Sequence, residues 1–325
     1  MHIFKNFKNF ADVEIDLSKP MTLLIGRNGS GKSNLIEGVE LLAYLMSVFN
    51  KPNEISDLGR GGRFEIRGGL NGCTRHSSEC FIVGYKDKIK FYFSETESIP
   101  RPHEIEDDYS CLIEVRLNNT KIEIITKKNT NNSNFLLLHN EHSTEFELHQ
   151  KYSNVFAFDI YPRAMRQYSS IGLNELTKNG FNISSVLYSL HQNKSETLNH
   201  ILEKIRQLPE EAFECFDFIT TSDNSDVLFA LKYPNGETIS AKLLSDGTLR
   251  ALAILTALET VPEGSRIIIE EIDNGVHASR VNVLIDAIWE ASNRRKLNTL
   301  ITTHNPATLD SLTDEQLECV VVCHY

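Results

Sequence analysis

Gly26-Arg27-Asn28-Gly29-Ser30-Gly31-Lys32-Ser33 fits the pattern G-x-x-x-x-G-K-[ST] in full. Its glycines let successive backbone N–H groups turn toward a phosphate without a Cβ clash. The apolar run 21–25 before it predicts a strand, and the helical spacing of apolar residues over 33–49 predicts a helix after it. Strand, glycine-rich loop and helix in this order predict a phosphate-binding loop at a helix N-terminus.

Most positions of this loop have a predicted role in binding ATP. Lys32 would bridge the β- and γ-phosphates, and the Ser33 hydroxyl would be a ligand of Mg²⁺. The other predicted ATP-binding residues are Gly26, Asn28, Gly29, Ser30, Gly31 and Asn34. The alternative is a chance glycine-rich turn before a helix. It is disfavoured because the full motif coincides with the expected strand–loop–helix context.

A second motif, Arg266-Ile267-Ile268-Ile269-Glu270-Glu271, is an apolar run that ends in two carboxylates. Strands of parallel sheets are continuous apolar runs, and active sites lie at their carboxyl ends. Glu270 would hold Mg²⁺, and Glu271 would act as the catalytic base that polarises the attacking water. Acidic residues after a strand are usually solvated loop residues. Their order after the phosphate-binding loop favours the functional interpretation.

Two further segments carry candidate residues. The apolar run 298–303 ends in His304, which would contact the γ-phosphate or the water, although alone it would be interpreted as a turn histidine. Leu244–Arg250 precedes a helix rich in Ala and Leu, with Ser245 as a good N-cap and Gly247 leaving backbone N–H groups open. Local evidence favours simple capping. The functional interpretation is that this helix N-terminus binds a γ-phosphate held by another subunit.

The remaining patterns predict the architecture. After residue 244 helices and strands alternate, which is typical of a parallel sheet in an α/β protein. The other expected elements are strands in 2–16, antiparallel strands at 81–93, 111–126 and 135–139, a polar turn at 127–134, helices over 175–218, and a hairpin at 226–242. We therefore expect an α/β P-loop NTPase with a mostly parallel core sheet, an antiparallel β lobe and a helical insertion. Residues 1–50 and 240–325 would form the ATPase core, and 51–239 the inserted lobe.

Length and composition narrow the classes of function. The 325 residues are 41% apolar and 24% charged, as in ordinary globular chains of about two domains. With 33 basic and 44 acidic residues the net charge is −11, which disfavours a generally basic nucleic-acid coat but not a local basic patch. No apolar run reaches the roughly 20 residues of a membrane helix. The six cysteines lack a C-x-x-C spacing, so we expect a cytoplasmic protein without disulfides, structural zinc or a membrane partner.

The order of these motifs resembles an ATP-binding-cassette (ABC) ATPase head of the SMC/RecF kind. Particular variants resemble AAA_21-type, OLD-like ATPases: Asn34 after the loop serine, L-S-D-G-T-L-R at 244–250, E-E-I-D-N-G-V-H at 270–277 and T-T-H-N-P-A-T-L-D at 302–310. Many of those ATPases serve bacterial anti-phage systems, including the Septu, Gabija and PARIS ATPase subunits and the OLD nucleases. The resemblance covers residues 1–45 and 240–315, with Gly180-Phe181-Asn182 as a further match.

The resemblance implies roles for the matching residues. Lys32 and Ser33 are the Walker A pair, Glu271 is the catalytic base, and His304 is the switch histidine. Ser245 and Gly247 match the signature that completes the neighbouring subunit's site, while Asp273 and Asn274 occupy the loop that crosses the interface. Glu270 stands where the family usually has Asp, so its longer side chain would alter the metal geometry. The Q-loop glutamine has no counterpart, and only the Arg/Gly segment 60–67 occupies that stretch.

The resemblance also implies an activity and partners. Two chains would pair head to tail, either alone or within a larger oligomer, bury two ATP molecules and hydrolyse them to ADP and phosphate. OLD-like nucleases continue into a TOPRIM domain, and no such acidic cluster follows His304. We therefore expect no nuclease domain in this chain. The first hypothesis is an ATPase that gates an effector protein in anti-phage defence, such as an HNH or TOPRIM nuclease.

Two other functions compete with this one. The first is a RecF-like, ATP-switched clamp on DNA, which would use local basic residues: Arg60, Arg63, Arg67, Arg75, Lys86, Lys88, Lys90, Arg163, Arg166, Arg294, Arg295 and Lys296. Scattered charges of this kind usually form a solvated face. The second is a scaffold with a dead site, which is disfavoured because Lys32, Ser33 and Glu271 are all present.

Overall fold

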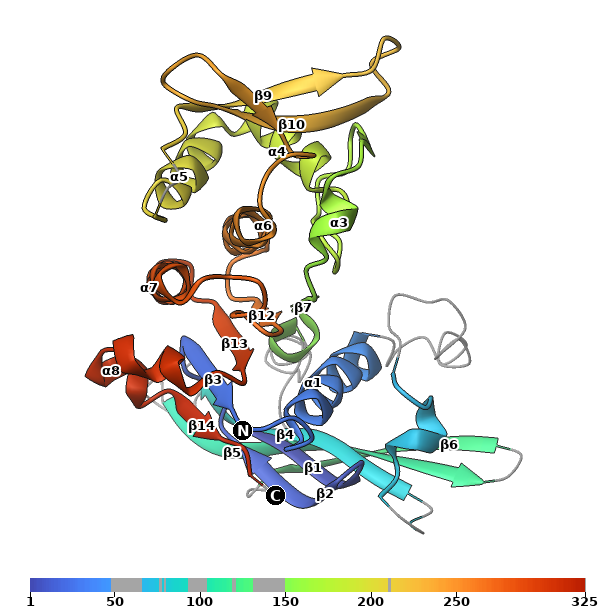
Figure 1. Cartoon of the computed structure of the whole chain (residues 1–325). Helices are drawn as coiled ribbons and strands as arrows, with labels where there is room; N and C mark the ends of the chain where they lie inside the picture. Colours follow the sequence, from blue (N-terminus) through green and yellow to red (C-terminus); the bar gives the residue numbers. More distant parts are fainter. Residues whose placement is uncertain are drawn as a thin grey trace, which may run out of the picture. The chain divides into compact units, whose positions relative to one another are not determined.

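The computed structural model describes residues 1–47, 66–75, 78, 80–92, 104–118, 121–130, 150–209 and 212–324 (Figure 1). The chain divides into two compact units. The first comprises Met1–Ser18 and Ser33–Val155, and the second comprises Lys19–Lys32 and Phe156–Tyr325. Among the described residues, no helix is both long enough and apolar enough to cross a membrane.

The first unit is built on an antiparallel sheet in the order β2-β1-β4-β5-β6. Its strands are β1 (His2–Phe7), β2 (Phe10–Ile15), β4 (Cys80–Tyr92), β5 (Glu104–Asn118) and β6 (Lys121–Thr130), and a short 3-10 helix, η2 (Leu70–Cys73), accompanies them. Aromatic rings from neighbouring strands form the core: Phe7 lies 5.9 Å from Phe4 and 5.5 Å from Phe81, between ring centroids.

Helix α1 (Lys32–Ser47) buries one side against this core. Gly38 faces the rings of Phe4 and Phe7, and there is no room for a side chain at this position. Across the helix, the buried Glu37 carboxylate forms ion pairs with Lys8 and Arg67. Both partners belong to the same unit. The two ion pairs therefore connect the first turns of α1 to one chain segment that precedes the helix and to one that follows it.

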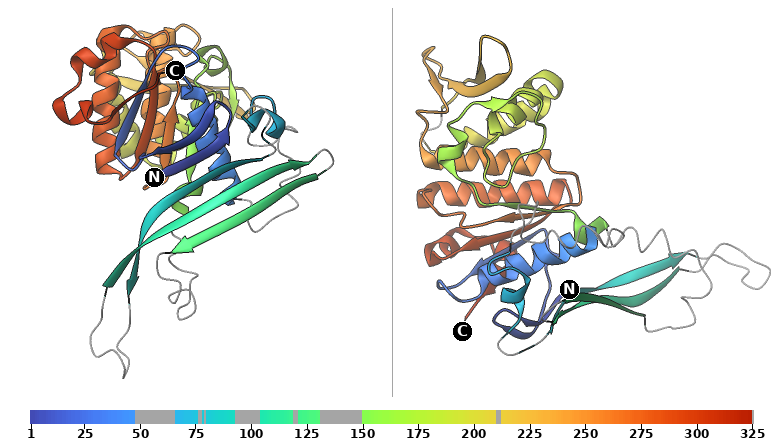
Figure 2. Two further views of the ribbon diagram at one scale, coloured as in Figure 1. Left: turned by 90° about the horizontal axis from the view of Figure 1, so that it is seen from below. Right: turned by 90° about the vertical axis from the view of Figure 1, so that its right-hand side faces the viewer.

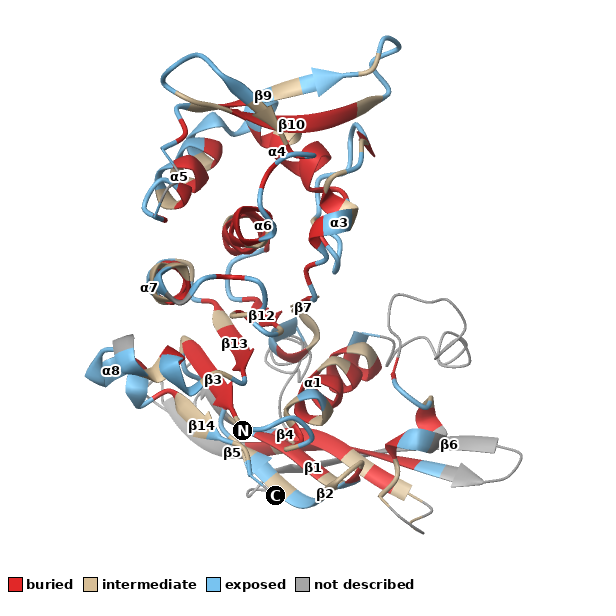
Figure 3. Cartoon of the chain, viewed as in Figure 1, coloured by how far each residue is buried: buried red, intermediate tan, exposed pale blue. Residues whose placement is uncertain are grey.

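The second unit contains a parallel sheet in the order β14-β3-β13-β12-β7. Its strands are β3 (Met21–Ile25), β7 (Val155–Phe158), β12 (Arg266–Ile269), β13 (Asn298–Thr303) and β14 (Val320–Val322). Residues of β3, β12 and β13 are almost all buried, as the apolar runs predicted (Figure 3). The short helical elements η3 (Pro306–Ser311) and α8 (Asp314–Leu317) connect β13 to β14.

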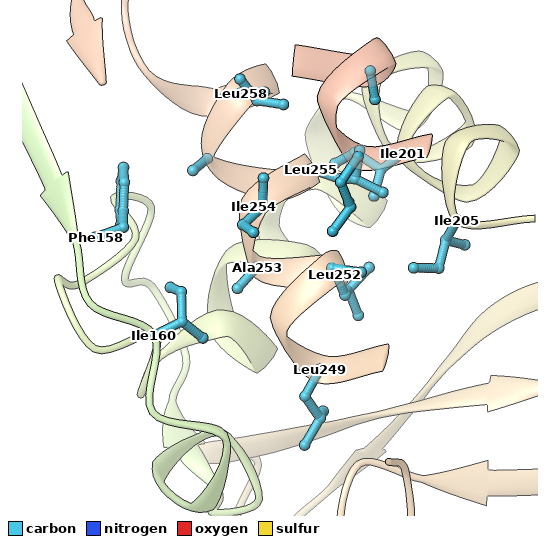
Figure 4. Packing of buried hydrophobic residues seen from close by; sticks show 14 of the residues in the cluster. Phe158, Ile160, Ile201, Ile205, Leu249, Leu252, Ala253, Ile254, Leu255 and Leu258 are labelled. Carbon is cyan, nitrogen blue, oxygen red and sulfur yellow. The ribbon is translucent and has the colours of Figure 1, made fainter. Parts of the chain in front are cut away.

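Helices α6 (Asp246–Thr260) and α7 (Ala278–Arg294) stack in layers beside this sheet (Figure 2). Beyond them lie α3 (Pro162–Met165), α4 (Ile183–Asn193), α5 (Ser195–Ile205) and a second, antiparallel sheet of β8 (Ser169–Ser170), β9 (Cys215–Thr220), β10 (Asp226–Lys232) and β11 (Thr238–Ser240). Apolar residues of α6 point in several directions, toward Ile201 and Ile205 of α5 and toward Phe158 and Ile160 (Figure 4). Helix α6 is therefore the centre of this unit's core.

The predicted elements were largely confirmed, with corrections at three boundaries. Segment 111–126 is not one strand, because Asn118 lies opposite Lys121 in an antiparallel pair of strands. Residues 127–130 are not a turn, because they continue β6 against Tyr109–Leu112. Residues 215–218 are not helical, because they pair with β10. The predicted strand 135–139 lies outside the described residues. The 226–242 hairpin is confirmed by the pairing of β10 with β11.

The compact units follow other boundaries than the predicted domains. Strands β1 and β2 share a sheet with β4, β5 and β6, and β7 shares one with β3. The compact units reflect contacts within the chain and do not test the predicted division into an ATPase core (1–50 and 240–325) and an insertion (51–239). That division stays a prediction.

Gly38→Ala tests the packing of α1 on β1. Alanine normally stabilises a helix interior by up to about 1 kcal/mol relative to glycine. Here the new methyl group would lie 2.5 Å from a ring carbon of Phe4. We therefore expect destabilisation by about 1–3 kcal/mol, measured by urea unfolding. The double variant Phe4→Leu with Gly38→Ala should recover part of that loss. A stabilised Gly38→Ala protein would contradict this packing.

Candidate active site

Three predicted site segments emerge from one edge of the parallel sheet. Thr303 of β13 lies opposite Ile25 of β3, and Ile269 of β12 lies opposite Ile301 of β13. Because these strands are parallel, their carboxyl ends meet at the same edge. The phosphate-binding loop, the Glu270–Glu271 pair and His304 each begin directly after one of these strands. The sequence could not show that these strands are neighbours.

The phosphate-binding loop has the backbone conformation that its glycines permit. Gly29 and Gly31 have φ angles of 82° and 98°, in the left-handed region that side chains disfavour. Gly26 is required for a different reason. A Cβ at this position would clash with the carbonyl oxygen of Cys323 and would lie 2.7 Å from Ser30 Oγ. The loop is thus held against the residue that follows β14.

Lys32 folds over its own loop. Its Nζ donates hydrogen bonds to the carbonyl oxygens of Gly26 (2.5 Å) and Arg27 (3.0 Å). Ser30 Oγ is buried and has no hydrogen-bond partner among the described residues. Burial raises the pKa of the neighbouring Cys323 thiol, and the charge of Lys32 opposes this shift. The thiol is therefore neutral near pH 7, so it does not form an ion pair with Lys32.

Ser33 and Asn34 continue the motif into the first unit. Ser33 is exposed. The Asn34 side chain donates to Asn9 Oδ1 (2.7 Å) and accepts from the Arg67 guanidinium (3.2 Å). Of the Arg/Gly segment 60–67, residues 60–65 lie outside the described residues. Arg67 ties that segment to α1, a role that the sequence did not reveal.

The two carboxylates after β12 differ in their surroundings. Glu270 is partly buried, and its N–H donates to the Phe158 carbonyl (3.2 Å). Glu271 is exposed and has a positive φ of 48°, which is uncommon for a residue with a side chain. Its N–H donates to Thr302 Oγ1 (2.9 Å), and its Oε2 accepts from the Asn274 amide (3.1 Å). These two contacts orient the predicted base, and sequence reasoning did not find them.

Asp273 and His304 form a second contact across this edge. His304 Nε2 lies 3.9 Å from Asp273 Oδ2, and the Asp273 side chain is only 6% exposed. The other oxygen, Asp273 Oδ1, is buried without a hydrogen-bond partner among the described residues. Unsatisfied buried carboxylate oxygens are costly, so this atom marks a place where a donor or cation fits.

The predicted signature segment lies at a separate hollow of about 400 Å³ in the second unit. Ser245, Asp246 and Gly247 line it from the N-terminus of α6, and Gly275, His277, Ser279 and Arg280 line it from the N-terminus of α7. Ser245 is the N-cap of α6, because its Oγ accepts the Thr248 N–H (3.1 Å). The helix capping predicted for Ser245 is thus confirmed. None of the lining residues belongs to the phosphate-binding loop.

The described residues fit a bound magnesium nucleotide. The loop offers glycines with positive φ, the Lys32 ammonium group, and a Ser30 Oγ that has no hydrogen-bond partner among the described residues, and each of these can contact phosphate oxygens. The Ser33 hydroxyl and the carboxylates that follow β12 are hard oxygen donors, which Mg²⁺ prefers. ATP and Mg²⁺ at these residues stay predictions from the sequence.

Comparisons with known proteins agree with this geometry. The family model AAA_21, described as "AAA domain, putative AbiEii toxin, Type IV TA system", matches residues 21–310. A structure of an SmcHead bound to the C-winged helix domain of ScpA is similar with a TM-score of 0.54. It is 15% identical, and the match covers 95% of this chain and 90% of that chain. At this identity the likeness shows the fold alone.

Curated relatives match over short segments. The DNA replication and repair protein RecF of Synechococcus sp. (strain JA-2-3B'a(2-13)) is 51% identical over 43 residues, which are 13% of this chain and 11% of RecF. RecF of Phocaeicola vulgatus is 29% identical over 92 residues, which are 28% of this chain and 24% of RecF. The chain thus spans about a quarter or less of the length of these relatives. The chain belongs to the AAA_21 family and has the α/β fold of an ABC-type ATPase head of the SMC/RecF kind.

Proposed function

We propose that this protein is an ATP-hydrolysing switch in which two chains close around ATP and gate a partner effector protein. The main observation behind the proposal is that the predicted ATP-binding residues lie at two separate places. Phosphate loop, acidic turn and His304 share one sheet edge, whereas Ser245 and Gly247 line a separate hollow. A second chain would bring its hollow to the phosphates bound at the first. ATP would then stabilise the closed dimer by mass action.

Each residue at the sheet edge has a task in this reaction. Lys32 and the N–H groups of the loop, together with Asn28, Ser30 and Asn34 beside them, hold the phosphates, while Ser33 and Glu270 are the residues that would hold Mg²⁺. Glu271, oriented by Thr302 and Asn274, accepts a proton from the attacking water. His304 would contact the γ-phosphate or the attacking water, and its Nε2 lies 3.9 Å from Asp273 Oδ2. The bound Mg²⁺ supplies charge neutralisation at the phosphates.

The effector part of the proposal rests on the family. The description of AAA_21 names a putative toxin of a toxin–antitoxin system, and the AAA_21-type and OLD-like variants in this sequence resemble subunits of anti-phage systems. The partner would be a nuclease or toxin chain in the same cytoplasm. Coexpression with the adjacent reading frame, followed by mass measurement with and without ATP, tests for such a complex.

A RecF-like clamp on DNA is the second candidate, because the short curated matches are to RecF. Several basic residues on which a clamp would depend have partners inside the chain. Arg294 pairs with Glu259, Arg295 donates to the carbonyls of Leu258 and Val261, and Arg166 pairs with Asp246. This arrangement favours the effector hypothesis. DNA affinity that falls steeply with salt, together with DNA-stimulated ATPase activity, would favour the clamp.

Lys32→Ala tests the phosphate loop. The substitution removes an ammonium group from a loop that already offers its N–H groups, so ATP should bind at least about tenfold more weakly. Isothermal titration with ATP measures this change. Lys19→Ala is the matched control, because Lys19 contacts the Glu318 carbonyl away from the loop. Equal ATP affinity of the Lys32→Ala and wild-type proteins would show that this loop does not bind the phosphates of ATP.

Mixing two inactive variants tests the shared site. Ser245→Asp keeps an N-cap residue but places a negative charge where a partner's phosphate would lie, so it should bind ATP without hydrolysing it. Lys32→Ala binds ATP weakly but keeps an intact signature. A mixture should recover part of the ATPase activity, because a heterodimer contains one complete site. Ser245→Asn, a neutral cap, should retain more activity than Ser245→Asp. No recovery in the mixture would mean that the site is not shared between chains.

A further inference from the structure

The hollow at the signature segment contains a carboxylate as well as helix N-termini. Asp246, the first residue of α6, lines the hollow beside Ser245 and Gly247, and its side chain is 61% exposed. A negative charge at this position stabilises the helix itself. In a site for a phosphate the same charge is unfavourable, because it repels the anion. A phosphate site at this hollow therefore requires a cation beside Asp246.

Arg166 supplies that cation. Its Nη2 nitrogen lies 2.6 Å from Asp246 Oδ1 and 2.8 Å from the Leu244 carbonyl oxygen. A guanidinium has donors only, so this nitrogen donates to the residues on both sides of Ser245. Among the described residues, neither the Arg166 nor the Asp246 side chain has a further hydrogen bond or ion pair. Within the described chain, the Asp246 carboxylate is therefore neutralised by Arg166 alone.

The backbone that carries Arg166 is fixed beside α6. Arg166 directly follows α3, and α3 contacts α6 (Figure 1). The preceding residue, Met165, is fully buried in the apolar cluster to which α6 belongs. An ion pair whose carboxylate is as exposed as that of Asp246 contributes little to folding. Stability of the fold thus does not account for an arginine held at this point.

We propose that Arg166 is a positioning residue that acts through Asp246: it neutralises this carboxylate, so that the signature hollow accepts an anion. The inference rests on the proposed function, in which the anion is the terminal phosphate of ATP bound to a second copy of the chain. Without the ion pair, the hollow would present an uncompensated carboxylate to that phosphate. The other ionisable residues that line the hollow are His277 and Arg280, and no variant in the test changes them.

The test uses full-length protein carrying Glu271→Gln, which binds ATP without turnover, and measures its MgATP-dependent dimerisation by analytical ultracentrifugation. Arg166→Gln should weaken dimerisation by about tenfold, because it leaves Asp246 unpaired. The affinity of the monomer for a fluorescent ATP analogue, measured at low protein concentration, should stay unchanged. Asp246→Asn alone should dimerise at least as well as the parent. Combining Arg166→Gln with Asp246→Asn should recover most of the loss, and Arg166→Lys, which keeps a cation, should retain dimerisation.

Salt separates a charge effect from lost packing. Dissolved ions screen a repulsion, so the deficit of Arg166→Gln relative to the parent should shrink as the salt concentration rises. A deficit caused by lost packing at α3 would lower the melting temperature and would persist at high salt. Arg294→Gln is the matched control, because Arg294 also pairs with a carboxylate of α6, Glu259, but at the other end of the helix. It should dimerise like the parent.

Two results would overturn the inference. If the combined variant dimerises as weakly as Arg166→Gln, then Arg166 acts on the backbone or on the phosphate directly, and not through the charge of Asp246. If Arg166→Gln dimerises like the parent, the unpaired carboxylate does not repel the anion. A Glu271→Gln parent that stays monomeric with MgATP would instead contradict the proposed function, and the inference with it.

Discussion

Parallel pairing of β13 with both β3 and β12 is the constraint on which the site depends. This register places the residues that follow three strands at one edge, although the phosphate loop lies more than 200 positions before the other two segments in the chain. Thr302, near the end of the central strand, fixes the turn after β12 through its hydroxyl and its carbonyl oxygen. A slip of one residue would move Glu271 away from these acceptors. The chemistry proposed for the edge is therefore a consequence of sheet register.

Much of this arrangement could be predicted from sequence because its signals are local. Successive glycines and a lysine before a helix predict a phosphate loop without knowledge of the rest of the chain. Apolar runs identified β3, β12 and β13 for the same reason, since each is buried on both faces. The capping role of Ser245 also follows from residue type and position. These motifs and their order were sufficient to predict the fold class.

The features that escaped prediction depend on long-range contacts. No pattern near Glu271 indicates that Thr302 binds its N–H, or that Cys323 excludes a side chain at Gly26. The same holds for the ion pair of Arg166 and Asp246, which are 80 residues apart. Strand boundaries at 111–130 and 215–218 were wrong because pairing with a neighbouring strand overrode local preference. Residues 51–65 and 131–149 are not among the described residues.

The central claim is that ATP joins two chains through the sheet edge of one and the signature hollow of the other. The most direct measurement is the mass of the Glu271→Gln protein in solution with and without MgATP, by light scattering coupled to size-exclusion chromatography. The account predicts a mass of about 37 kDa without nucleotide, matching the 36.9 kDa chain, and a doubling of that mass with MgATP. An unchanged monomer mass under saturating MgATP would contradict it.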